Sequence, residues 1–86
     1  MAKAAVKRRL PACGSISQVR SIYSWKGTLR DEAEALIIFK TTEEKVPRLR
    51  AFLEKEHPCE TPEIIEVQVA RVNAHYLSRV VESVAV

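Results

Sequence analysis

The chain has little of what lets a small protein stand alone: two cysteines, two glycines and one tryptophan in 86 residues. Cys13 and Cys59 allow at most one intramolecular disulfide. This excludes the cysteine density of a secreted mini-protein and favours a reducing cytosol. A chain of this size buries only about 60–65% of the surface that its unfolded form exposes. We therefore expect oligomerisation to supplement the core.

Long apolar runs are also absent. The longest, Ala35 to Phe39, is far too short to span a bilayer. The basic N-terminus is not followed by the apolar stretch of a signal peptide. We predict one domain, residues 1–86, located in the cytoplasm and without a membrane partner.

Enzyme signatures are missing as well. The sequence shows no nucleophile–base pair, no phosphate-binding loop and no paired acids at a useful spacing. We therefore predict that the protein is not an enzyme.

The formal net charge of +3 is unevenly spread, because residues 1–30 contain bases and no acid. A basic region can attract nucleic acid. The alternative is a solvated helix face and strand edge. Aromatic side chains do not alternate with these bases as stacking sites would require, so we do not expect a nucleic-acid partner.

Hydrophobic periodicity predicts the order helix, strand, strand, helix, strand, helix. The predicted strands are 15–25, 32–41 and 64–70. The predicted helices are 2–12, a stretch that begins at Thr42 and ends before Pro58, and the stretch after Asn73. Helices packed on one face of an antiparallel sheet make an α+β domain. A split βαβ arrangement would need one more strand before the first helix.

The first two predicted strands, 15–25 and 32–41, are expected to form a hairpin. Lys26 and Gly27 mark its turn, because glycine adopts a positive φ without strain. The second strand is apolar on both faces from Ala35 to Phe39. Such a strand is normally central in its sheet or covered by a partner subunit.

Two later helices are predicted to be amphipathic. Thr42 and Asn73 are suitable N-caps. The expected buried stripes are Val46, Leu49, Phe52 and Leu53 in the first, and Tyr76, Leu77, Val80, Val81 and Val84 in the second.

Four ordered motifs cover nearly the whole chain. They are Ser21–Gly27 (SIYSWKG), Ile37–Thr42 (IIFKTT), His57–Ile65 (HPCETPEII), and Asn73–Leu77 (NAHYL) with the later Glu82-Ser83-Val84. In combination they resemble the CutA family of divalent-cation tolerance proteins. Leu10-Pro11-Ala12-Cys13 is similar to the family's sequence at the end of its first helix.

The resemblance implies a homotrimer of ferredoxin-like subunits with an architecture like that of PII signalling proteins. It also implies a non-catalytic role in tolerance of divalent metal ions, copper among them. The family's opening strand, which is central in its sheet, has no counterpart before the first helix of this sequence. We therefore expect a ferredoxin-like sheet with its first strand missing.

The resemblance also suggests where a metal ion binds. Copper sites assigned in the family use a cysteine of the opening strand and a His-His pair, and that pair maps to Glu56 and His57. Only His57 carries over. Cys59 stands where the family usually has Tyr, and imidazole with thiolate suits copper or zinc. Our candidate metal ligands are therefore His57 and Cys59, the alternative being a helix C-cap beside a small buried thiol.

A second candidate site is a cleft between subunits. Its candidate residues are Tyr23, Trp25, Lys40, Glu60 and Glu63, which would hold a small anionic ligand or a partner protein. The alternatives are an aromatic inter-subunit core and ordinary ion pairs. Cys13 and His75 also carry donor atoms; we expect Cys13 to be a core residue and His75 to be solvated.

Overall fold

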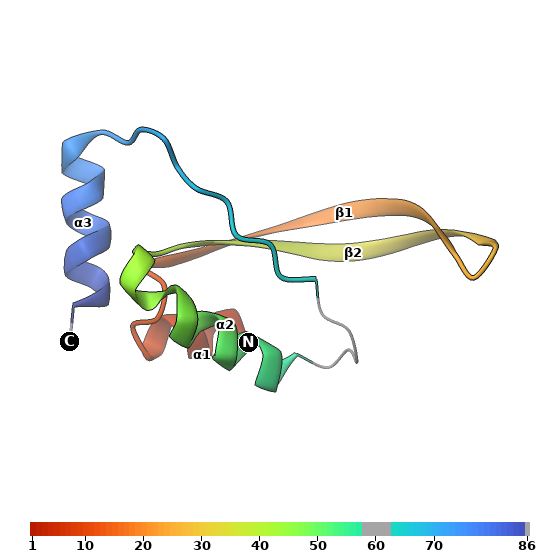
Figure 1. The fold of residues 1–86 in the computed structure, drawn as a ribbon, viewed down its shortest axis with the longest axis horizontal. Helices are drawn as coiled ribbons and strands as arrows, with labels where there is room; N and C mark the ends of the chain where they lie inside the picture. Colours follow the sequence, from red (N-terminus) through yellow and green to blue (C-terminus); the bar gives the residue numbers. More distant parts are fainter. Residues whose placement is uncertain (58–62, 86) are drawn as a thin grey trace.

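In the computed structural model, which describes residues 1–57 and 63–85, the helices gather at the base of a long β-hairpin (Figure 1). The elements are α1 (Ala2–Lys7), β1 (Cys13–Trp25), β2 (Thr28–Lys40), the 3-10 helix η1 (Glu43–Lys45), α2 (Val46–Glu56) and α3 (Ala74–Val84). The hairpin extends away from this base, so the molecule measures 46 × 26 × 18 Å.

The hairpin confirms the predicted turn. β1 and β2 pair antiparallel from Cys13 opposite Lys40 to Trp25 opposite Thr28. Lys26 and Gly27 between them have φ values of 50° and 77°. Positive φ at both central residues defines the type I′ turn, whose twist matches that of paired strands. Pairing therefore continues up to the turn, and the second strand begins four residues before the predicted Glu32.

The first helix is shorter than predicted. It ends at Lys7 rather than at residue 12. Arg9 has a φ of 56°, in the left-handed region, and the chain turns there. Pro11 disfavours a helical conformation at the residue before it, so the chain leaves the helix early. Thr41 Oγ1 donates a hydrogen bond of 2.6 Å to the Leu10 carbonyl and holds this turn against the end of β2.

The helix after β2 forms as predicted, through a short 3-10 turn. Thr42 is extended and precedes η1, and Pro47 lies in the first turn of α2, where a missing N–H costs little. Leu49, Phe52 and Leu53 of the predicted stripe are buried, and its fourth residue, Val46, is half-buried.

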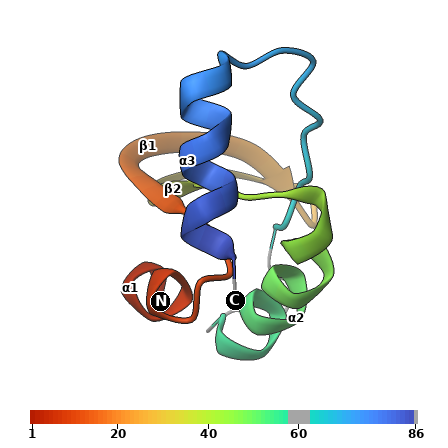
Figure 2. The same cartoon turned by 90° about the vertical axis from the view of Figure 1, so that its left-hand side faces the viewer.

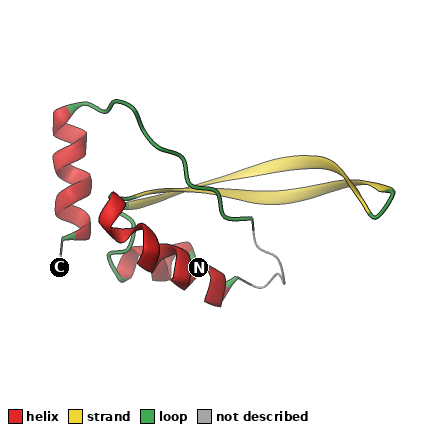
Figure 3. Cartoon of the chain, in the orientation of Figure 1, coloured by secondary structure: helices red, strands yellow, loops and turns green. Residues whose placement is uncertain are grey.

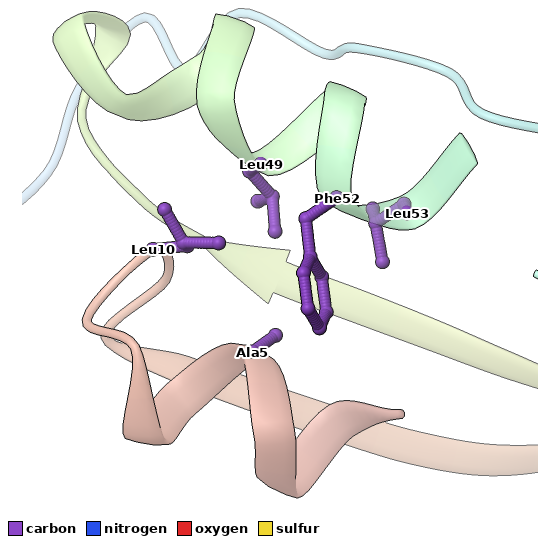
Figure 4. Close-up of a cluster of buried hydrophobic side chains, with 5 residues drawn as sticks. All are labelled: Ala5, Leu10, Leu49, Phe52 and Leu53. Atoms are coloured by element: carbon purple, nitrogen blue, oxygen red, sulfur yellow. The ribbon is translucent and has the colours of Figure 1, made fainter. Parts of the chain in front are cut away.

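These three side chains form the core with the first segment of the chain. α1 and α2 lie side by side below the hairpin (Figure 2). The buried cluster is Ala5, Leu10, Leu49, Phe52 and Leu53 (Figure 4). Phe39 and Ile64 pack against it. A Cβ at Gly14 would lie 3.1 Å from Phe39 Cε1, so a larger residue there would have to displace this ring slightly.

The last helix is buried less than predicted. Asn73 is its extended N-cap residue, and Val80 and Val84 are buried. Leu77 and Val81 remain 48% and 49% exposed, because only one edge of α3 contacts the rest of the chain. Arg9 Nη1 donates a 3.1 Å hydrogen bond to the Ala85 carbonyl at the end of this helix.

The third predicted strand, 64–70, is wrong for the single chain. Residues 63–69 carry no helix or strand, and the described sheet contains only β1 and β2 (Figure 3). Backbone groups of residues 63–72 make no backbone–backbone hydrogen bond within the described part of the chain. A strand forms only beside a partner that accepts its hydrogen bonds. The sequence has the right alternation here, but the fold brings no second strand alongside it.

Candidate functional site

His57 lies at the end of α2, where the sequence placed it. It is the extended C-cap residue of the helix, and its backbone N–H donates to the Leu53 carbonyl at 2.9 Å. The side chain is half-buried. Its predicted partner Cys59 lies outside the described residues, so the pair stays a prediction.

The described part of the chain does not contain a full set of metal ligands. Within residues 1–57 and 63–85, no three His, Cys, Asp or Glu side chains come together as metal ligands would. His75 is exposed on α3, as predicted. A divalent cation bound near His57 would therefore need donors from residues 58–62 or from another subunit.

A small polar cluster lies at the base of the hairpin. Lys40 Nζ donates to Ser15 Oγ at 2.9 Å and lies 3.9 Å from Cys13 Sγ. Cys13 is half-buried at the start of β1, beside the core rather than inside it. The sequence contained the signal for this cluster, because Cys13 and Lys40 are equally distant from the Lys26–Gly27 turn and so lie opposite each other.

Two of the predicted cleft residues lie at the far end of the hairpin. Tyr23 donates its hydroxyl proton to Glu32 Oε1 at 3.1 Å. Partial desolvation raises the pKa of Tyr23 above its ordinary value, and the hydrogen bond and charge of Glu32 add to this. Trp25 is 55% exposed, and Lys26 Nζ lies 5.7 Å from its ring centroid.

The predicted cleft residues are not brought together within one chain. Tyr23 of β1 is opposite Arg30 of β2, whereas Lys40 is the last residue of β2. Ten residues of antiparallel strand separate Arg30 from Lys40, or about 34 Å. Glu63 is exposed, and Glu60 lies outside the described residues. A cleft containing both Trp25 and Lys40 would therefore have to form between subunits.

The middle of the hairpin carries an exposed ion pair. Arg20 donates from Nε to Asp31 Oδ1 at 2.7 Å, and a second bond joins Nη2 to Oδ2. The hydrogen bonds from Arg20 lower the pKa of Asp31, and the pKa of Arg20 is raised by the same contact. Ser21 Oγ donates to Glu34 Oε2 nearby at 2.7 Å.

Both faces of the hairpin also expose apolar side chains. Ile16, Ile22 and Leu29 share one face and are 62%, 61% and 75% exposed. On the other face, Leu36 and Ile38 are 45% and 54% exposed. Exposed apolar surface on this scale is typical of a protein–protein interface.

None of the helices within residues 1–57 and 63–85 has the length and apolar character needed to cross a membrane.

Comparison with known proteins identifies the family to which the chain is similar. Residues 1–83 match the family described as CutA1 divalent ion tolerance protein. Over 79 residues the chain is 43% identical to the divalent-cation tolerance protein CutA of Thermotoga maritima, covering 92% of this chain and 78% of that protein. Protein CutA of Mus musculus is 39% identical over 89 residues, which cover 99% of this chain. The chain spans only 50% of that mouse protein's length.

A solved structure has the same arrangement of elements. The PII-like protein CutA from Nostoc sp. PCC 7120 in apo form superimposes with a TM-score of 0.91 at 30% sequence identity, covering 98% of this chain and 83% of that chain. The fold is therefore α+β and ferredoxin-like, as predicted. By sequence and by structure, this chain belongs to the CutA1 divalent ion tolerance family.

Proposed function

We propose that the protein is a non-catalytic homotrimer that acts in tolerance of divalent metal ions, copper among them. The family match supports the metal-tolerance role. The observation that carries the proposed assembly is the hairpin, whose two faces expose apolar residues that the single chain leaves uncovered. A chain of this size gains the missing burial most directly by packing these faces against other copies.

His57 is our candidate for the metal-contacting residue of this chain. It is a half-buried imidazole at a helix end, next to residues 58–62, which contain Cys59 and Glu60. Imidazole, thiolate and carboxylate are the donor types that bind copper and zinc. In the trimer, donors from neighbouring subunits would complete the coordination.

The test measures Cu(II) and Cu(I) binding calorimetrically, together with the mass of the assembly by sedimentation. His57→Ala should weaken copper binding at least about tenfold, since the loss of a residue that only supports a metal ligand already costs about 10–100-fold. His75→Ala removes an exposed imidazole on α3 and serves as the matched control, with no expected effect. Equal binding by both variants would remove His57 from the site, and a monomer by sedimentation would rule out the trimer.

A second candidate function is suggested by Lys40. In this alternative the protein is a PII-like regulatory or scaffolding trimer whose inter-subunit clefts bind a small anionic ligand or a partner protein. The Lys40 ammonium group is held at the hairpin base by Ser15, and no acid of the described residues pairs with it. This function predicts ligand binding that is independent of metal and is weakened by Lys40→Gln.

A further inference from the structure

A shallow groove of about 340 Å³ lies where the end of α1 meets one side of α2. Three cationic and three apolar side chains line it: Arg8, Arg48, Lys55, Leu10, Ala51 and Phe52. No acidic residue contributes to the lining. The volume falls within the range of about 300–1,000 Å³ that small-molecule sites occupy.

Four of the six residues that line the groove belong to α2. Arg48, Ala51, Phe52 and Lys55 are spaced so that they share one face of α2. Phe52 and Leu10 are only 7% and 8% exposed, because both belong to the core cluster between the two segments (Figure 4). The floor of the groove is therefore made of Ala51 and the exposed edges of two core side chains.

The cations at the rim have no ion-pair partner among the described acids. The Arg8 guanidinium carbon lies 4.9 Å from the centroid of the Phe52 ring, in a cation–π contact. Arg8, Arg48 and Lys55 form no ion pair with an acid in residues 1–57 and 63–85. Uncompensated positive charge thus adjoins a small apolar floor.

We propose that this groove binds a small aromatic anion, whose ring lies on Ala51 and the exposed edges of Leu10 and Phe52 and whose carboxylate or phosphate lies among the three cations. Guanidinium groups donate paired hydrogen bonds to such anions and also stack on aromatic rings. A free inorganic anion would leave the apolar floor wet, and a neutral ring would leave the cations unpaired. The ligand must therefore combine both chemistries. This proposal does not depend on the metal-tolerance role.

The test is an NMR titration of the 86-residue protein with 1-naphthyl phosphate, with inorganic phosphate and 1-naphthol in parallel. We expect saturable shifts of the backbone amides of Leu10, Ala51 and Lys55. The ring and the anion each contribute to affinity. Inorganic phosphate alone and 1-naphthol alone should therefore each bind at least about tenfold more weakly than 1-naphthyl phosphate.

Charge-removing variants then locate the anion. Arg8→Gln and Arg48→Gln should each weaken binding about threefold, as expected for one exposed ion pair. Arg71→Gln is the matched control, because Arg71 is an exposed base that does not line the groove. All three positions are exposed, and circular dichroism would verify that the variants remain folded.

Three outcomes would overturn the proposal. The first is that the shifts appear at the exposed apolar residues Ile22 and Trp25 instead of the groove. The second is that inorganic phosphate or 1-naphthol alone binds as tightly as 1-naphthyl phosphate. The third is that Arg8→Gln and Arg48→Gln bind no differently from Arg71→Gln.

Discussion

The base of the molecule and its hairpin arm have comparably apolar sequences but bury them very differently. At the base, Leu49 and Phe52 are 6% and 7% exposed. On the arm, Ile16 and Leu29 are 62% and 75% exposed. The stripe of α2 is buried because α1 lies opposite it, whereas no helix or strand of the described residues lies opposite either face of the arm (Figures 1 and 2). An apolar pattern in the sequence thus shows which side chains could be buried. They are buried only where another element packs against them.

Residues 63–72 resemble the arm in how they expose apolar side chains. Ile65, Val67 and Val69 alternate along an extended backbone and are 72%, 78% and 73% exposed. Only Ile64 reaches the core. The comparison therefore divides the chain into a base that packs within itself and two extended regions whose apolar faces the described residues leave exposed.

The largest expected effect tests this division directly. Phe52→Ala should lower the free energy of unfolding by about 3–5 kcal/mol, because it leaves a cavity in the core. Trp25→Ala, at the exposed tip, should lower it by about 0.5 kcal/mol or less in dilute protein. Unfolding in guanidinium chloride, at low protein concentration, measures the free energy of unfolding of both variants. Similar losses for the two variants would mean that Trp25 is buried within the folding unit, and the division would fail.

The two glycines give a smaller contrast of the same kind. Gly14→Ala places a methyl group 3.1 Å from the Phe39 ring at the base and should cost about 1–3 kcal/mol through overpacking. At the tip, a Cβ on Gly27 meets no atom within 4 Å. Gly27→Ala should therefore cost only the strain of its positive φ, about 1–2 kcal/mol.

Thermal unfolding combined with Phe39→Leu separates the two causes. The smaller side chain should relieve the cost of Gly14→Ala and leave that of Gly27→Ala unchanged. Relief of both, or of neither, would contradict the assignment of packing to one glycine and backbone strain to the other.

The smallest expected effect concerns the exposed ion pair of the arm. Since Arg20 lowers the pKa of Asp31, the pair stabilises the fold above the unfolded-state pKa of about 3.9. This contribution is lost as the pH falls through the lowered pKa of the folded state. Asp31→Asn should therefore flatten the pH dependence of stability in acid. Glu44→Gln, at an exposed acid without an ion pair to a described base, is the control and should leave the profile unchanged.

Much of the local structure was predictable from the sequence. The hairpin turn follows from glycine at a position that needs positive φ, and the stripe of α2 follows from helical spacing. The place of His57 at a helix end follows from the proline after it. These features depend on neighbours close in the chain, whose chemistry the sequence displays directly.

The candidate sites were predictable only in part, because register and contact decide them. Tyr23 and Trp25 lie far from Lys40, since the pairing places them at opposite ends of one hairpin. The contact of Lys40 with Cys13 and Ser15 required that same register. The groove beside Phe52 required the turn at Arg9, whose left-handed backbone no composition rule indicated.

The sequence alone determined which stretches are helical or extended, where the hairpin turns, and which family the motifs resemble, because these depend on local spacing and turn chemistry. Tertiary structure alone decided which apolar faces are buried. A helix face is buried when another element lies against it, and an extended segment becomes a strand when a neighbour accepts its hydrogen bonds. In this chain α2 has such a neighbour in α1, whereas residues 63–72 and the hairpin arm do not find one within the described residues.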